Sequence, residues 1–214
     1  MKIVFTGGGT GGHFYPIIAV VQKVNQIIDH ENIIGAKLYY LSDSPYDREV
    51  LFEHGLEYEE IRTGKMRTYF SLKGFFENIT DIFKTFFGTI NAIIKVFSIY
   101  PDVVFGKGGY ASFPTIFAAR LLGIPVIIHE SDSVPGRVNK WAGHFAKKIA
   151  LSFGEAAQYF PQRKQKDIAW TGQPIRTEIE IPASREEGFE YFKLESNLPV
   201  ILVLGGSQGA ELIN

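Results

Sequence analysis

The sequence predicts an α/β protein built on a doubly wound, Rossmann-like parallel sheet. Short apolar segments alternate with helical patterns along most of the chain, as they do in βαβ units. Three glycine-rich stretches, residues 7–12, 106–109 and 205–209, each follow an apolar segment directly, as strand–loop–helix turns do in this fold. Hydrophobic residues make up 45% of the 214 residues and charged residues 21%, which is typical of a folded chain.

The strands are expected where short apolar segments recur. Strands of this kind, separated by helices, favour a parallel sheet that is covered on both faces, with right-handed crossovers. The expected strands are residues 2–5, 37–41, 57–61, 102–105, 125–129, 148–152 and 168–171, with a further buried strand at 200–204.

The segments between these strands predict helices. In the first of them Ile17, Val21 and Ile28 fall on one face, and Gly55 and Gly123 follow two others as C-caps. The expected helices are residues 15–29, 45–54, 75–98, 114–122 and 185–194.

The segment 75–98 has apolar residues at helical spacing, and we expect this main stripe to be the core face of a helix. The start of this helix and the preceding loop, residues 69–82, carry more apolar surface than one sheet face can cover. Basic residues border this apolar surface. This combination predicts contact with an anionic membrane surface. The predicted membrane patch consists of Leu72, Lys73, Phe75, Phe76, Ile79 and Ile82.

Composition excludes several classes of protein. Lys and Arg number 22 and Asp and Glu 23, and this balance excludes a strongly basic nucleic-acid-binding protein. The absence of cysteine excludes disulfides, thiolate catalysis and Cys-ligated zinc. We find no signal peptide and no run of about 18 uninterrupted apolar residues, so we expect no membrane-spanning segment.

The first glycine loop, residues 7–12, predicts a site for a phosphate or a developing anion at the start of a helix. It fits the dinucleotide fingerprint, but the acidic Asp43 lies about 30 positions further on instead of the usual 20 or so. A dinucleotide site and a purely structural turn both remain open alternatives. His13 follows this loop, either as a general base or as part of the loop scaffold.

Two further segments are expected at the same edge of the sheet, because each follows a strand. The second glycine loop includes Gly108, Gly109 and Tyr110, which we expect to contact substrate. Residues 129–132 supply a histidine and two carboxylates, Glu130 and Asp132, which could hold a sugar hydroxyl, serve as a base or be a solvated loop. Their spacing does not predict a zinc site.

Together these segments resemble the MurG family of N-acetylglucosaminyltransferases, which have a GT-B fold of two Rossmann-like domains. The resemblance runs from end to end of the chain. It rests on matches at residues 7–16, 106–112, 123–130, 139–141, 171–176 and 205–210.

The resemblance implies an inverting transfer of GlcNAc from UDP-N-acetylglucosamine to the C4 hydroxyl of the N-acetylmuramoyl unit of lipid I, without a metal or another cofactor. Lipid I is undecaprenyl-pyrophosphoryl-MurNAc-peptide, so the enzyme would act peripherally on the cytoplasmic face of the cell membrane in peptidoglycan synthesis. The implied divisions are residues 1–172 for the acceptor-side domain, 173–198 for a linker and helix, and 199–214 for the start of an incomplete donor-binding domain.

The resemblance also implies roles for individual residues. Thr10, Gly11 and Gly12 would line the sugar side of the cleft. Arg176 and Ser207 would contact the donor, and His13 and Glu130 would handle the acceptor, with His13 as the base. Asp132 stands where the family usually has Asn, which removes an amide donor and adds a charge.

Two other interpretations stay open. The chain could be the acceptor-binding, membrane-docking subunit of a GlcNAc transferase that is split into two chains, or an NAD-binding domain. We also expect the chain to be part of a longer protein, because a single strand and glycine loop after residue 199 cannot bury a core.

Overall fold

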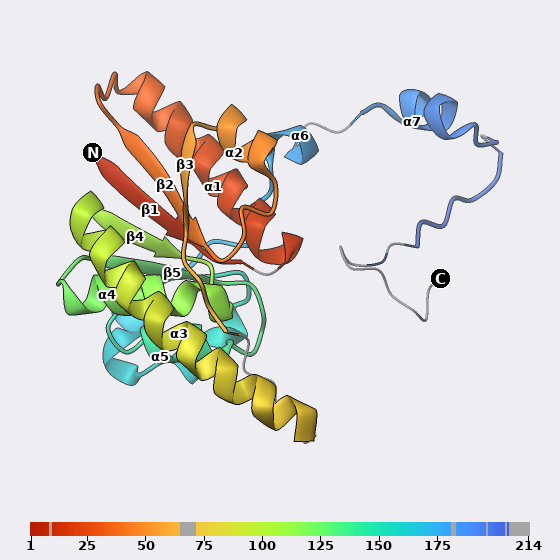
Figure 1. Cartoon of the computed structure of the whole chain (residues 1–214). Helices are drawn as coiled ribbons and strands as arrows, with labels where there is room; N and C mark the ends of the chain where they lie inside the picture. The colour runs from red at the N-terminus through yellow and green to blue at the C-terminus, as the bar shows by residue number, and fades with distance from the viewer. Residues whose placement is uncertain (9, 65–71, 181–182, 196, 204, 206–214) are drawn as a thin grey trace.

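The structure is a computed structural model that describes residues 1–8, 10–64, 72–180, 183–195, 197–203 and 205, with residues 72–79 described by their backbone alone. A seven-stranded parallel sheet in the order β3-β2-β1-β4-β5-β6-β7 forms its centre (Figure 1). Because the order reverses between β1 and β4, the predicted doubly wound, Rossmann-like fold is confirmed. The strands are β1 (Lys2–Thr6), β2 (Lys37–Ser42), β3 (Leu56–Glu60), β4 (Val103–Gly106), β5 (Val126–Glu130), β6 (Lys148–Leu151) and β7 (Ile168–Trp170).

Helices cover both faces of this sheet (Figure 1). Phe5 of β1 packs in one core layer with residues of α1 and α2, whereas the neighbouring Val4 packs in the other layer with residues of α3, α4 and α5. The described helices are α1 (Gly11–His30), α2 (Arg48–Glu53), α3 (Leu72–Ile99), α4 (Phe113–Leu121), α5 (Arg137–Ala142), α6 (Thr177–Glu180) and α7 (Arg185–Phe192). Short 3-10 turns lie at Tyr110–Ser112, Gly154–Tyr159 and Gln162–Asp167.

The start of α1 lies four residues earlier than predicted. Thr10 is extended (φ −153°, ψ 160°), and its carbonyl accepts hydrogen bonds from the backbone N–H groups of His13 and Phe14. The glycines of the first loop therefore run directly into the first turn, and His13 is a helical residue at the end of the helix where the dipole is positive.

Helix α3 corrects one prediction, because its main apolar stripe is not the core face. The buried residues in the described part of α3 are Asp81, Gly88, Ala92 and Val96. Ala92 and Val96 pack in the core with residues of the sheet and α4, and Gly88 lies against the Arg62 backbone. Thr80–Ile99 would be long and apolar enough to cross a membrane by length and composition, although Ala92 and Val96 belong to the protein core. The exposed apolar side chains are those of Ile82, Phe83, Phe86, Phe87, Ile90, Ile94 and Phe97.

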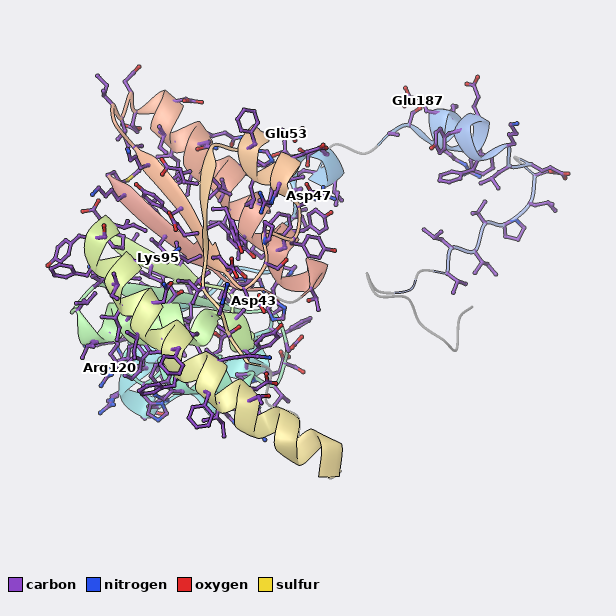
Figure 2. The ribbon with its side chains drawn as sticks, viewed as in Figure 1. Asp43, Asp47, Glu53, Lys95, Arg120 and Glu187 are labelled. Carbon is purple, nitrogen blue, oxygen red and sulfur yellow. The ribbon has the colours of Figure 1, made fainter. Side chains whose placement is uncertain are left out.

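A polar contact also fixes α3 against the sheet. The Lys95 ammonium lies 2.5 Å from a carboxylate oxygen of Glu59 on β3. Lys95 is labelled on α3 in Figure 2. Lys95 is largely covered. This ion pair ties α3 to β3 beside the hollow that Phe83 and Phe87 also line.

The buried strand expected at residues 200–204 is not formed over the described residues 200–203. The side chains of Val200, Ile201 and Leu202 are exposed, and none of these residues pairs with a strand of the sheet. A parallel strand is held by hydrogen bonds to neighbouring strands, so an apolar segment with no neighbour stays extended and open. Helix α7 has no buried residue either, although Ser184 and Glu187 form a complete capping box.

Candidate active site

The glycine loops that follow β1 and β4 meet at the carboxyl edge of the sheet. The two strands are neighbours, with Thr6 beside Gly106, and their helices α1 and α4 leave toward opposite faces. This is the topological switch point, where open α/β sheets bind ligands. Between the loops lies a cavity of about 400 Å³, which we call the edge cavity. Its lining includes Thr10, Gly12, His13, Lys107, Gly108, Gly109, Glu130, Ser131, Asp132, Gly136, Asn139 and Gln173.

Glycine is required where the second loop touches the first. A Cβ on Gly109 would lie 3.2 Å from His13 Nε2 and 3.3 Å from the Gly8 carbonyl oxygen. Gly109 also has φ +78°, a left-handed conformation that side chains disfavour. The loop can therefore pass close to the imidazole, which places His13 Nε2 at the wall of the edge cavity.

His13 is positioned through one ring nitrogen, since its Nδ1 lies 3.1 Å from Thr10 Oγ1. Its Nε2 lies close to Gly109 in the lining of the edge cavity. Burial lowers the pKa of His13, and the Lys107 ammonium lowers it further, while Asp132 and Glu130 act in the opposite direction. The imidazole is therefore mainly neutral at pH 7 and can accept a proton.

Lys107 is a site residue that the sequence analysis did not single out. Only 2% of it is exposed, and its ammonium donates a hydrogen bond to Ser131 Oγ, which in turn donates to Gln173 Oε1 at 2.8 Å. Burial lowers the pKa of Lys107 to about 8, against the opposing effect of Glu130 and Asp132. The group still carries a proton at pH 7, so it can hold an anionic oxygen. The signal in the sequence that could have identified Lys107 is a lysine inside a glycine loop that directly follows a central strand.

The Glu130 carboxylate is already occupied by three donors. The backbone N–H groups of Asp132 and Gly136 and the Nδ2 of Asn139 each donate to it at 3.0 Å. Glu130 is 4% exposed, so these bonds are shielded from water. They fold the segment 131–136 over the end of β5. Asn139, on the unpredicted helix α5, also donates to the His129 carbonyl at 3.0 Å.

The far wall of the edge cavity is fixed by residues after β6 and β7. The buried His129 donates through Nε2 to the Gly172 carbonyl at 3.0 Å, and burial, together with Lys107, lowers its pKa to about 4. Ser152 donates to Gln173 Oε1 at 2.8 Å, the same oxygen that Ser131 contacts. His129 is therefore a neutral structural group that ties β5 to the turn after β7.

Some of the predicted site residues lie elsewhere. The Arg176 guanidinium stacks 4.4 Å above the Tyr15 ring on the outer side of α1 and does not line the edge cavity. Gly11 is buried inside the first helical turn. Tyr110 lines an adjoining cavity, and burial and Asp43 raise its pKa to about 12. Ser207 lies outside the described residues.

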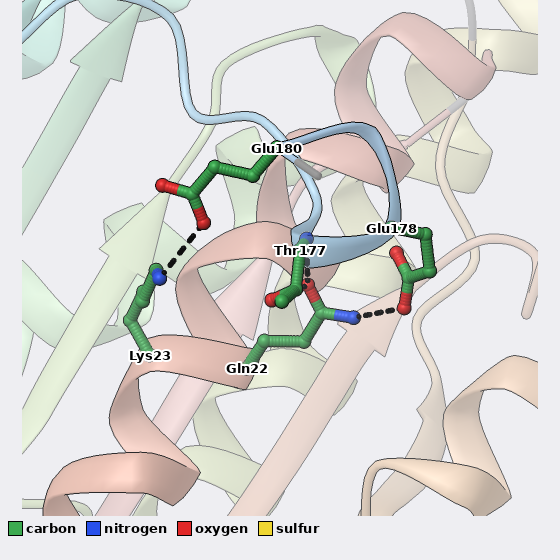
Figure 3. A network of polar contacts seen from close by, with 5 residues as sticks. All are labelled: Gln22, Lys23, Thr177, Glu178 and Glu180. Atoms are coloured by element: carbon green, nitrogen blue, oxygen red, sulfur yellow. Dashed lines mark hydrogen bonds and ion pairs between the residues drawn. The ribbon is translucent and has the colours of Figure 1, made fainter. Parts of the chain in front are cut away.

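The segment after Arg176 is attached to α1 by a small polar network (Figure 3). Gln22 accepts a hydrogen bond from the Thr177 backbone at 3.0 Å and donates to Glu178 at 2.8 Å. Lys23 and Glu180 add an ion pair at 3.0 Å. The chain that follows β7 therefore crosses back to the middle of the first helix, α1.

The predicted membrane patch is only partly described. Ile82 is exposed, as expected, and the backbone of residues 72–79 is helical. The side chains of Leu72, Lys73, Phe75, Phe76 and Ile79 lie outside the described set. In the described part of the chain, no group of three or more His, Cys, Asp or Glu side chains could hold a metal ion.

The seven-stranded parallel sheet with its switch-point cavity has the architecture of a Rossmann-like domain of the GT-B type. Residues 3–151 match the glycosyltransferase family 28 N-terminal domain, and the chain belongs to that family. It is 38% identical over 213 residues to UDP-N-acetylglucosamine--N-acetylmuramyl-(pentapeptide) pyrophosphoryl-undecaprenol N-acetylglucosamine transferase 2 of Bacillus cereus (strain ATCC 10987 / NRS 248), covering 100% of this chain and 56% of the relative. A transferase of the same type from Legionella pneumophila (strain Lens) is 39% identical, with 55% of its length covered.

Solved structures agree with this assignment. The crystal structure of Acinetobacter baumannii MurG matches with a TM-score of 0.59 and 26% identity, covering 85% of this chain and 47% of that one. Anabaena HepE in complex with UDP matches with a TM-score of 0.57 at 12% identity, which shows a shared fold. The chain spans about half the length of the curated relatives it matches.

Proposed function

We propose that this chain is the acceptor-side half of an enzyme that transfers GlcNAc from UDP-GlcNAc to lipid I, giving lipid II for peptidoglycan synthesis. The observation that carries the proposal is the edge cavity, where His13, Lys107 and Glu130 from three elements meet at the switch point of the sheet. The names of the Bacillus and Legionella relatives describe this transfer. Gly12 leaves room for a sugar against the backbone, since a Cβ there would meet nothing closer than Thr10 Oγ1 at 3.6 Å.

The reaction is a single displacement in which His13 is the base. In the tautomer whose Nδ1–H donates to Thr10 Oγ1, the lone pair of Nε2 is left to accept a proton at the edge cavity. Nε2 takes the proton of the acceptor's C4 hydroxyl while that oxygen bonds to the anomeric carbon of GlcNAc. The bond from that carbon to the UDP oxygen breaks, UDP leaves with the electron pair, and the anomeric configuration inverts.

Lys107 and Glu130 act beside the base in different ways. The buried Lys107 ammonium stabilises negative charge in the cavity and keeps His13 neutral. Glu130 is a positioning residue, because its oxygens are taken up by the 131–136 segment and Asn139. Asp132 is exposed at the cavity rim, where its carboxylate can accept hydrogen bonds from sugar hydroxyls.

The donor nucleotide is bound mainly by a second domain of the GT-B type. Arg176 and Ser207, with the third glycine loop, are the residues of this chain to which the family resemblance assigns contact with UDP. Arg176 lies on the outer side of α1, over Tyr15, where its charge is available to a diphosphate.

Helix α3 supports peripheral attachment to the cytoplasmic face of the membrane. Its exposed Phe83 and Phe87 stand beside Arg62 and Lys84, which pair with Glu60 and Asp81 at 3.3 Å. The two cations are more than half exposed, so anionic headgroups can reach them. We expect the chain to co-sediment with phosphatidylglycerol vesicles and less with phosphatidylcholine vesicles. Equal binding to both vesicle types at low salt would contradict the electrostatic part of this assignment.

The transfer itself is tested with the two-domain protein that contains this chain. In an assay of labelled GlcNAc transfer to a soluble lipid I analogue, His13→Ala should lower kcat by about 100-fold or more. His30→Ala, at the exposed other end of α1, is the matched control and should leave kcat unchanged. Unchanged turnover in His13→Ala would remove His13 from the mechanism. Binding of NAD without any binding of the lipid I analogue would refute the proposed function.

A further inference from the structure

The edge cavity continues away from the sheet as a connected series of hollows. A second cavity of about 480 Å³, the middle cavity, shares His13, Gly109 and Gly136 with the edge cavity. A third hollow of about 420 Å³ lies between α3 and α4 and shares Thr85 and Phe113 with the middle cavity. We call this third hollow the α3–α4 groove. Each volume falls within the range of small-molecule sites, about 300–1,000 Å³.

The chemistry of the lining changes in one direction along this series. The edge cavity holds Lys107 and Glu130, and the middle cavity is bordered by Tyr110 and Arg137. The α3–α4 groove is lined by aliphatic and aromatic side chains and by threonines of α3. A charged end, an intermediate section and an apolar end fit an amphiphile whose head lies near His13.

The threonines do not make the groove polar. The hydroxyl of Thr85 donates to the Asp81 carbonyl at 2.8 Å and accepts from the Gly64 N–H at 3.0 Å. The hydroxyl of Thr89 donates to the Thr85 carbonyl at 2.7 Å. Both hydroxyls are satisfied by backbone groups, so the groove favours a hydrocarbon chain over a polar one.

We propose that the α3–α4 groove binds the first isoprene units of the acceptor's polyprenyl chain, with Arg137 beside the diphosphate that joins chain and sugar. This inference rests on the proposed function and adds a tail-binding subsite to it. The occupant is a single prenyl chain because the groove is continuous with the edge cavity, whereas a bilayer would contact the whole exposed face of α3. Phe86 and Ile90, which line the groove, are 59% and 42% exposed, so an incoming chain can cover them.

Trp141 provides a direct reporter for the groove. Its ring lies 5.2 Å from Phe113 and 6.4 Å from Phe117, the α4 residues that form one wall. The exposed Trp170 can be replaced by Phe, which leaves Trp141 as the single tryptophan. The probes are monomeric farnesyl diphosphate and inorganic diphosphate, titrated into this 214-residue chain without any membrane.

The decisive variants are Phe86→Asp, in the groove, and Phe97→Asp, a matched exposed phenylalanine of α3 outside it. We expect farnesyl diphosphate to shift Trp141 fluorescence and to bind more tightly than inorganic diphosphate. Phe86→Asp should weaken farnesyl diphosphate binding at least about tenfold, and Phe97→Asp less than about twofold. Neither variant should change the binding of inorganic diphosphate.

Other results would overturn the subsite. Equal affinity for the two probes, no binding of either, or equal weakening by both variants would each refute it. If Phe86→Asp and Phe97→Asp both abolish binding to phosphatidylglycerol vesicles and neither changes the affinity for farnesyl diphosphate, the α3 face binds the bilayer alone and the subsite is refuted. The transfer assay with His13→Ala is independent of these titrations, so the groove can fail while the proposed function stands.

Discussion

Removing the Glu130 carboxylate should unfold the wall of the edge cavity. Three donors converge on it at 3.0 Å, and hydrogen bonds to a charged group each contribute about 1.5–3 kcal/mol. In Glu130→Ala, water can reach the N–H groups of Asp132 and Gly136 in their exposed loop, so the loss is smaller than the full sum. We expect the free energy of unfolding to fall by about 3–5 kcal/mol.

Urea unfolding followed by circular dichroism measures this change. Glu130→Gln keeps one acceptor oxygen and should cost about 1–3 kcal/mol, while the exposed Asp132→Asn should stay within about 0.5 kcal/mol of the parent. A loss below about 1 kcal/mol in Glu130→Ala would refute the reasoning, because the three bonds would then not stabilise the fold. Full stability of Glu130→Gln with loss of transfer activity would instead assign Glu130 to the chemistry.

Three more predictions follow from buried or strained groups. The pKa of His129 is about 4 against about 6.5 unfolded, so its stabilisation is complete above pH 6.5 and is lost as the pH falls toward 4. Between pH 7 and pH 4.5, the free energy of unfolding measured with urea should fall by about 2 kcal/mol less in His129→Gln than in the parent. Equal falls would show that His129 is not the source of the pH dependence. Gly109→Ala should lower stability by about 1–2 kcal/mol and shift the NMR signals of His13, whereas unchanged His13 signals would rule out the close approach. Gln22→Ala should release Thr177, so trypsin should cut faster after the preceding arginine; an unchanged rate would mean that this network does not hold the segment.

Much of the sheet follows from local sequence. Segments such as residues 37–41 and 148–152 are short, apolar and bounded by polar residues, and the strands β2 and β6 lie there to within a residue. Because the carboxyl ends of parallel strands lie at one edge of a sheet, the sequence also predicts that the first two glycine loops lie close together. Both inferences depend on short stretches of sequence, namely the strand segments and the glycine loops that directly follow them.

Helix α3 shows where this approach fails. Apolar residues at helical spacing identify a stripe, but the same spacing serves a core face and an exposed binding face. The buried edge is set instead by close approach: Ala92 and Val96 pack with residues of α4, and Gly88 lies against the Arg62 backbone, where a side chain would not fit. Helix α5 was missed for another reason: its six residues show no period, and Asn139 gains its role only from contact with Glu130.

The pairing of Lys107 with His13 explains why both glycine loops are needed. A base at the positive end of a helix and beside a buried ammonium resists protonation, so His13 stays ready to accept a proton at neutral pH. The same ammonium is kept charged by Glu130 and Asp132, which raise its pKa against the effect of burial. His13 follows the first glycine loop and Lys107 lies in the second. The two loops can come into contact only because residue 109 is a glycine. In the proposed mechanism, Lys107 can thus stabilise the leaving or bridging oxygens next to a His13 base that remains neutral.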